Sequence, residues 1–312
     1  MAENLTSHRP VLAVTLKLSA VFLFVVMSGL IKATSDTILP GEQVFFRSFF
    51  AIPVILVWLA TRGQLASGLV PRNLRSHIWR GILGTTGMGL TFAGLGLLPL
   101  PEVTAIGYGT PIFTVVLAAL MLGERIRLVR ISAVLLGLVG VVIMLWPRLG
   151  AGSTTDQAAS LGALLILIAT LTRALVQIHI RQMVQSESTA SIVFYFSLTA
   201  SVVSLATIPF GWVLPDREAL ILLVLAGLMG GVAQILVTAS YRFAPASLLA
   251  PYDYSSMIFA ILIGYVWFSE LPTLVMLTGA TLVIAGNILV IWRERQLGLE
   301  RPKARSVTDP KA

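Results

Sequence analysis

The sequence predicts an all-α integral membrane protein in which ten transmembrane helices form two inverted five-helix repeats. Three observations support this prediction. The 312-residue chain is 56% hydrophobic and only 12% charged, about half the charge of a typical soluble domain. Its apolar residues fall into long runs of the length that crosses a bilayer as a helix. Several residues also recur 146 positions apart, which indicates a duplicated half.

Ten apolar runs define the expected spans. In chain order they are residues 11–33, 43–61, 77–98, 101–122, 127–146, 159–182, 189–209, 217–241, 246–268 and 272–292. In lipid a backbone must satisfy its own hydrogen bonds, so each run is expected to be helical. Barrel strands would instead give short alternating segments, which the sequence lacks.

Short links separate the runs and divide the chain into two halves. Pro99 and Pro101 form a turn between the third and fourth spans, because proline cannot continue the preceding helix. The link 147–158 contains glycine and serine and is the expected seam between the halves. We therefore expect a first repeat over 11–146, a second repeat over 159–292 and a basic cytoplasmic tail over 293–312.

The 146-residue recurrence is clear in the later spans of each half and faint in the first two. The matched pairs are Pro99 with Pro245, Tyr108 with Tyr254, Glu124 with Glu270, Gly140 with Gly286 and Trp146 with Trp292. Because each half carries five spans, an odd number, the two halves must insert in opposite orientations. Inverted repeats of this kind are typical of transporters that bind substrate where the halves meet.

The basic residues predict the orientation in the membrane. With the N-terminus inside, the cytoplasmic segments contain 16 of the 22 Lys and Arg residues, the outer loops contain three, and three lie within spans. Short cytoplasmic loops are enriched in Lys and Arg, so both termini are expected in the cytoplasm of a bacterial cell, with the protein in the inner membrane. In this count Arg80 belongs to a cytoplasmic segment and Lys32 to an outer loop.

The composition excludes several function classes. The chain has no cysteine, its three histidines lack metal-ligand spacing, and it contains no nucleotide-binding motif or nucleophile–base set. We therefore expect no enzyme activity, no metal and no cofactor. A nucleic-acid role is not expected, because the arginines lie in separate loops. The expected partners are a small-molecule substrate and the lipid bilayer, with the protein a monomer or homodimer.

Several motifs carry a resemblance to a known family. They are the segment Phe45 to Ala51, the pair Thr110-Pro111, the segment Leu122 to Arg125, and the glycines Gly137 and Gly140. The chain resembles EamA-type carriers of the drug/metabolite transporter superfamily over residues 11–292, and most resembles YddG-type amino-acid exporters. The resemblance implies a central cavity lined by helices one to four and six to nine. Ser269 and Met257 depart from the pattern, so the ninth span is expected to bend differently.

Two spans carry a stripe of residues at helical spacing. The third span has Gly81, Thr85, Met88 and Phe92; the eighth has Gly227, Gly231, Gln234, Thr238 and Tyr241. Steps of three and four place each set on one helix face. One interpretation is close helix packing, which small residues permit. The other is a cavity wall with one polar and one apolar flank, suited to an amphipathic substrate.

Charged residues within the spans are candidate gate or binding residues. Asp253 lies about seven residues from the cytoplasmic end of its span, and Lys17 lies at a similar depth. A buried ionised group should face a partner or water, so the two are expected to pair as a gate. Alternatively, Asp253 binds the amine of the substrate or a proton. A third interpretation is that Lys17 extends to the interface and Asp253 is only hydrated.

Two arginines within spans have similar alternatives. Arg47 is expected to form a structural ion pair with Glu42 or Glu102, or else to attract a carboxylate. Arg173, one turn from Gln177, is expected either to hold an amino-acid carboxylate or to brace the bundle through backbone carbonyls.

Aromatic residues and helix-end acids complete the candidate site. Tyr108 and Tyr252 could stack on planar substrates. Pro111 removes a backbone hydrogen bond and is expected to free a carbonyl toward the cavity. Glu124 and Glu270 close matching helices, and we expect them to accept hydrogen bonds from amides at the start of the next helix.

These features predict a secondary transporter that exports amino acids, aromatic and neutral ones favoured, and related metabolites by alternating access. An alternative is a carrier of the same superfamily that imports a nucleoside-like or methylated compound. A membrane enzyme or scaffold is a further alternative, although the dispersed acids argue against it.

Overall fold

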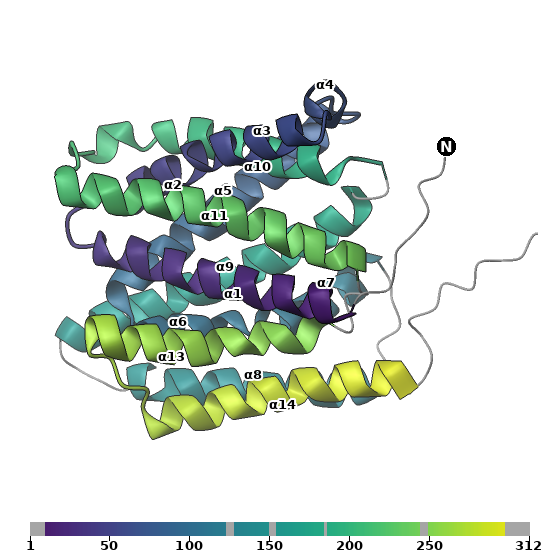
Figure 1. The fold of residues 1–312 in the computed structure, drawn as a ribbon. Helices are drawn as coiled ribbons and strands as arrows, with labels where there is room; N and C mark the ends of the chain where they lie inside the picture. Colours follow the sequence, from purple (N-terminus) through teal and green to yellow (C-terminus); the bar gives the residue numbers. More distant parts are fainter. Residues whose placement is uncertain (1–9, 123–127, 150–153, 184–185, 244–248, 297–312) are drawn as a thin grey trace, which may run out of the picture.

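The computed structural model describes residues 10–122, 128–149, 154–183, 186–243 and 249–296, and over these residues it is all-helical. Its long helices run back and forth along one common direction, as Figure 1 shows. The elements are α1 (Pro10–Ala33), α2 (Pro40–Phe49), α3 (Ala51–Thr61), α4 (Leu65–Gly68), α5 (Leu74–Leu97), α6 (Leu100–Gly107), α7 (Thr110–Leu122), α8 (Leu128–Leu149), α9 (Thr154–Met183), α10 (Thr189–Leu205), η1 (Ile208–Phe210), α11 (Arg217–Phe243), η2 (Ala250–Tyr254), α13 (Ser255–Phe268) and α14 (Leu274–Gln296).

Every expected span coincides with one of these helices or with two consecutive ones. Apart from the short elements α4 and η1, the helices within the described residues group into ten segments, because α2 with α3, α6 with α7, and η2 with α13 each form one broken segment. Four segments are long and apolar enough to cross a membrane by length and composition: Val11–Ala33, Pro40–Thr61, Gln157–Ile180 and Arg217–Val237. The expected seam at 147–158 is shorter than predicted, because α8 continues to Leu149 and α9 begins at Thr154.

The outer surface of the bundle is apolar. Large hydrophobic side chains are widely exposed on several helices, including Leu120, Trp146, Ile258 and Val266. A contiguous apolar surface of this kind is unfavourable in water and indicates an interaction site or a lipid-facing surface. The described exterior therefore agrees with a multi-span membrane protein.

Proline accounts for the break between α6 and α7. Pro111 lies in the first turn of α7 and has no N–H to offer to Gly107, four residues earlier. The Gly107 carbonyl instead accepts a hydrogen bond of 2.8 Å from the Thr110 hydroxyl. Pro111 thus removes a backbone hydrogen bond as expected, and the freed carbonyl is satisfied locally by the Thr110 hydroxyl.

The helices pair in a pattern that relates the two halves. The packing pairs between the halves include α1 with α11, α5 with α9, α2 with α10, α6 with α13, and α8 with α14. The first segment of each half thus packs on the third segment of the other half. The second, fourth and fifth segments each pack on their own counterparts. Figure 1 shows α8 and α14 side by side along one edge of the bundle.

Two contacts show that the first segments of the two halves run in opposite directions. Lys32, near the end of α1, donates to the Leu98 carbonyl just after α5, so α1 and α5 end at the same side. His179, near the end of α9, lies 3.2 Å from the Ser76 carbonyl near the start of α5. α9 is therefore antiparallel to α5, and α1 is antiparallel to α9.

Glycine permits the close contact between α8 and α14. A Cβ atom on Gly140 would lie 2.6 Å from the carbonyl oxygen of Gly279, and the reverse substitution would meet the Gly140 carbonyl at the same distance. Because neither residue has a side chain, the two backbones touch directly. Buried Met144 and Val283 fill the space beside this contact.

The end of α13 has unusual backbone geometry. Ser269 has a φ of 56°, in the left-handed region that favours glycine. The following amide, Glu270 N–H, bonds back to the Gly264 carbonyl at 2.9 Å, and the Ser269 amide bonds to the Tyr265 carbonyl at 3.1 Å, so both bonds close the end of the helix. Ser269 thus departs from the expected Gly-Glu pair at a position where glycine has a physical advantage.

Candidate functional site

An ion pair lies at each end of the interface between α1 and the η2–α13 segment. Lys17 Nζ lies 2.7 Å from Asp253 Oδ1, and Lys32 Nζ lies 2.9 Å from Glu270 Oε1. Lys17 and Lys32 are 15 residues apart, which places them about 22 Å apart along α1. The structure therefore brings Lys17 and Asp253 together, as their matching depth suggested, and adds a second ion pair at the opposite end.

The two partners in the Lys17–Asp253 pair differ in accessibility. The Lys17 side chain is 3% exposed, whereas the Asp253 side chain is 49% exposed. The lysine is thus buried against neighbouring helices, while water or a solute can reach the carboxylate. This asymmetry makes Asp253 the group that a proton or a cationic solute would reach first.

The opposite pair belongs to a network that joins four helix ends. Lys32 Nζ donates to the carbonyls of Leu95 and Leu98, at 3.0 and 2.6 Å. Glu270 Oε2 accepts the Leu100 amide at 2.8 Å. Glu270 therefore caps the start of α6. We expected it to cap the helix that follows it in the chain, α14, so the predicted partner is wrong. The turn at Ser269 brings Glu270 back beside Gly264, within reach of α6. Glu124 lies outside the described residues.

Lys32 is a site residue that sequence reasoning missed. It was counted among the charges of an outer loop, but it occupies the last turn of α1. The sequence did contain one indication of this role, because Lys32 ends the first apolar run at the same side of the membrane as Glu270, which follows the ninth span.

Two accessible polar residues lie on α9. The Arg173 side chain is exposed and donates from Nη2 to the Thr91 hydroxyl at 3.1 Å. Gln177, one turn further, accepts a hydrogen bond of 3.1 Å from Thr114 in α7. Among the described residues the hydrogen bond found for Arg173 goes to a hydroxyl and not to a backbone carbonyl. None of the ion pairs found among the described residues involves this guanidinium.

The prediction that Arg47 pairs with Glu102 is wrong. Arg47 is buried, and its guanidinium lies over the Phe196 ring of α10, with Cζ 5.8 Å from the ring centroid. Glu42, the other expected partner, accepts the Val213 amide at 3.3 Å. The physical reason is lateral position, because α2 packs on α5, α10 and α11, whereas α6 packs on α9 and α13. Equal depth in the membrane does not place two helices side by side.

The side chain of Tyr108 is held by contacts within the protein and is not available to stack on a planar substrate. Its hydroxyl donates to the Tyr254 carbonyl at 3.1 Å and lies 2.6 Å from Ser256 Oγ. Its ring meets that of Tyr254 edge-on, with centroids 5.2 Å apart, and its own carbonyl accepts from Asn287 at 3.2 Å. Tyr108 thus fixes η2, the element that carries Asp253. Tyr252 is half-buried in η2, beside Asp253.

The glycine ends of the two stripes are packing surfaces. A Cβ atom on Gly227 would meet Phe50, and one on Gly231 would meet Val54, so α11 packs closely on the α2–α3 segment. In α5, Thr85 is buried, and its hydroxyl donates to the carbonyl of Gly81, one turn earlier in the same helix, at 2.7 Å. Met88 packs against the core. Thr85 is thus turned into its own helix, whereas Met88 is half-buried, and a cavity wall that includes Met88 stays a prediction. Gln234 is half-buried, and the side chains of Thr238 and Tyr241 lie outside the described part.

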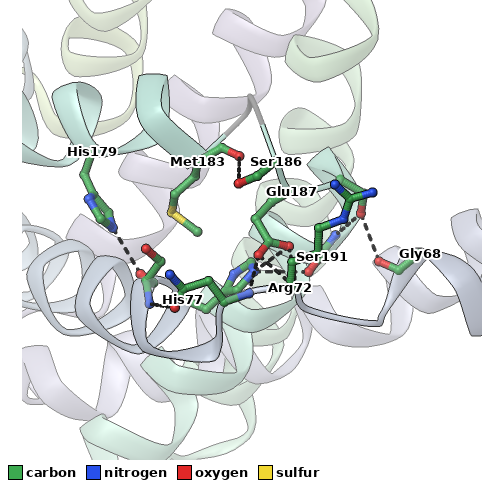
Figure 2. A network of polar contacts seen from close by, with 11 residues as sticks. Gly68, Arg72, His77, His179, Met183, Ser186, Glu187 and Ser191 are labelled. Atoms are coloured by element: carbon green, nitrogen blue, oxygen red, sulfur yellow. Dashed lines mark hydrogen bonds and ion pairs between the residues drawn. The ribbon is translucent and has the colours of Figure 1, made fainter.

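A polar network that the sequence did not predict closes the end where α5 and α10 begin (Figure 2). Glu187 Oε2 lies 3.2 Å from His77 Nε2, and Glu187 also accepts the amides of Arg72 and Asn73 at 2.9 and 2.6 Å. Burial raises the pKa of the Glu187 carboxyl, but the amide hydrogen bonds and His77 together lower it below its ordinary value. The network holds the α4–α5 link against the α9–α10 link.

Comparison with known proteins identifies the family of the chain. The chain matches the EamA-like transporter family over residues 11–146 and 160–292. A solved crystal structure aligns with a TM-score of 0.64 at 19% identity, covering 91% of this chain and 98% of the other. That likeness supports the fold alone.

Two characterised relatives differ in what they carry. The chain is 28% identical over 255 residues to an S-adenosylmethionine uptake transporter of Rickettsia prowazekii, covering 82% of this chain and 84% of that protein. It is 28% identical over 277 residues to the pseudopaline exporter CntI of Pseudomonas aeruginosa, covering 88% and 94%. Neither relative is described as an aromatic amino-acid exporter. The match over both halves, together with the all-helical multi-span fold, shows that this chain belongs to the EamA-like transporter family.

Proposed function

We propose that this protein is a secondary transporter of the bacterial inner membrane that exports amino acids and related metabolites by alternating access. The observation that carries the proposal is the pair of ionic contacts at opposite ends of one interface, Lys17–Asp253 and Lys32–Glu270. A carrier must open one end while the other is closed, and an ion pair at each end supplies two separate closures.

The Lys17–Asp253 contact would act as the gate on the cytoplasmic side. The orientation rests on the excess of Lys and Arg at this end, where α1 begins and α14 ends (Figure 1). Asp253 is half-exposed, so a substrate amine or a proton that reaches it competes directly with Lys17. Weakening the contact in this way would favour the inward-open state. The shift equals the difference between the binding free energies of the ligand in the inward-open and the closed state.

The pairing of helices across the halves supports rocking of two inverted repeats. Each first segment packs on the third segment of the other half, and α1 runs antiparallel to α9. Such an arrangement lets one set of contacts open as its counterpart closes. In this proposal the repeats are residues 11–146 and 159–292.

Arg173 and Gln177 are the proposed polar contacts for the substrate. Both are exposed on α9, and the Arg173 guanidinium retains donors beyond the one that Thr91 accepts. Arginine binds carboxylates through two parallel hydrogen bonds, which suits an amino-acid headgroup. The exporter relative from Pseudomonas aeruginosa supports outward movement.

A second candidate is uptake of a nucleoside-like or methylated compound. It is favoured by the relatives from Rickettsia, which are described as S-adenosylmethionine uptake transporters. The two candidates share the fold and the gates and differ in substrate and direction.

Transport in proteoliposomes distinguishes them. Vesicles containing the purified protein are loaded with labelled neutral and aromatic amino acids or with labelled S-adenosylmethionine, and efflux is followed with and without a pH gradient. Efflux of amino acids above that of protein-free vesicles supports the first proposal. Movement of S-adenosylmethionine alone supports the second, and no movement of any amino acid rejects the first.

A further inference from the structure

Two buried arginines meet at a point deep inside the bundle. Arg47 extends from α2 and Arg80 from α5, and each is less than one-tenth exposed. Both guanidinium groups lie over the ring of Phe196 in α10, with Arg80 Cζ 3.8 Å and Arg47 Cζ 5.8 Å from its centroid. Arg80 was expected to be a topological charge, but it falls within the predicted span 77–98 and is part of the interior.

The guanidinium groups lack the partners that buried charges normally have. Arg47 Nε, Arg80 Nε and Arg80 Nη1 are buried without a hydrogen-bond acceptor among the described residues. The ion pairs found within the described ranges involve other residues, so no carboxylate balances these two charges. A buried cation is strongly unfavourable unless it is paired, and two adjacent cations also repel each other.

Phe196 does not replace the missing negative charge. A ring face attracts a cation through its quadrupole, but it accepts no N–H hydrogen bond of the strength that a carboxylate accepts. Glycines complete the surroundings, since a Cβ atom on Gly230 would lie 3.2 Å from Arg47 Nε and one on Gly84 would lie 3.6 Å from Arg80 Nη1. The helices thus leave room for two guanidinium groups, three nitrogens of which have no acceptor among the described residues.

We propose that Arg47 and Arg80 form a binding site for a carboxylate of the transported molecule. Both guanidinium groups present unpaired N–H donors, and this group type matches a carboxylate in shape and charge. The site lies between α2, α5, α10 and α11, apart from Arg173 on α9. The inference rests on the proposed function for the identity of the ligand, but binding can be tested without transport.

Thermal unfolding of the purified full chain in detergent tests the site. Sodium chloride is replaced by sodium acetate at constant ionic strength, with sodium phosphate as a separate arm. The variants are Arg80→Gln and Arg47→Gln. Arg62→Gln is the matched control, because Arg62 also stacks on an aromatic ring, with Cζ 4.9 Å from the Trp58 centroid, but is exposed.

Acetate is expected to raise the unfolding midpoint of the wild type and of Arg62→Gln by a few degrees, because a ligand that binds only the folded state stabilises it. Arg80→Gln and Arg47→Gln should lose this response. In chloride alone, Arg80→Gln should unfold at the same temperature as the wild type or higher, because one of two unpaired like charges is gone.

Other outcomes overturn the inference. An equal acetate response in all four proteins shows that the arginines do not bind the anion. A marked fall in the midpoint of Arg80→Gln in chloride, or its failure to fold, shows that the guanidinium is a structural brace. A response to phosphate but not to acetate assigns an inorganic anion. Acetate stabilisation that depends on Arg80 supports the site even if the transport assays fail.

Discussion

Lys32 Nζ lies 2.9 Å from Glu270 Oε1, and this contact closes the end of the α1–α13 interface opposite to Lys17. The same lysine holds the end of α5 through two carbonyls, and the same glutamate caps the start of α6. Opening this end therefore requires several polar contacts to separate together. A concerted rearrangement of this kind is what a gate between two states needs.

Removing the charge of Glu270 should open this end. We expect Glu270→Gln to increase maleimide labelling of a cysteine placed at Ile263, which contacts Gly29 of α1, by about fivefold, the effect of roughly 1 kcal/mol on a two-state equilibrium. The measurement is clean because the chain has no native cysteine. Glu218→Gln, in the first turn of α11, is the control. Unchanged labelling would show that this ion pair does not hold the interface closed.

The Glu187 network predicts a dependence of stability on pH. The pKa of Glu187 is lower in the folded protein than its ordinary value of about 4.3. A lowered carboxyl pKa stabilises the fold above the unfolded-state value, and this contribution is lost as the pH falls through the folded value. The wild type should therefore exceed Glu187→Gln in unfolding midpoint above about pH 5. The difference should shrink progressively below about pH 4.

Thermal melts of both proteins at a series of pH values test this. A difference that grows on acidification would contradict the sign, and Glu218→Gln should show no such trend.

Ser269 offers a stabilising substitution. Its φ of 56° is costly for a residue with a Cβ atom, whereas glycine adopts it freely. We expect Ser269→Gly to stabilise the protein by up to about 1 kcal/mol, since part of the gain is offset by greater freedom in the unfolded chain. A higher unfolding midpoint with unchanged helix content would support this. A lower midpoint would mean that the serine hydroxyl contributes more than the backbone strain costs.

The sequence predicted the features that depend on position along a single helix, namely the extent of each span and the depth of its polar residues. Hydropathy located every span, since the length of an apolar run is a property of the run itself. Depth along the helices also anticipated that Lys17 and Asp253 could meet. Lateral neighbours were not predictable, because depth does not specify which helices are adjacent. Depth alone therefore made Glu102 one of the two acids expected to pair with Arg47, although Arg47 lies beside Phe196 and Arg80.

The same limit explains the misassigned roles of Tyr108 and Lys32. Spacing placed Tyr108 on a helix face but could not show that Tyr254, Ser256 and Asn287 occupy its polar groups. Lys32 was placed in a loop because its run ends nearby, and only the fold brings Glu270 to it. Polar residues near span ends are therefore poorly assigned by charge counting alone.

Asp253 gives the sharpest test of the proposed gate. Asp253→Asn removes the charge that holds Lys17 but preserves the shape of η2, which Tyr108 fixes through the Tyr254 carbonyl. Because Asp253→Asn takes the carboxylate from Lys17, which is only 3% exposed, we expect a lower unfolding midpoint. Transport in proteoliposomes, compared per folded protein, should fall by at least about tenfold, or about 1.4 kcal/mol. Asp216→Asn, at the opposite end beside the start of α11, is the control for loss of an acid. Transport at the wild-type rate in Asp253→Asn would remove this residue from the mechanism. If the double variant Lys17→Gln/Asp253→Asn transports faster than Asp253→Asn, the role of Asp253 is to balance the charge of Lys17.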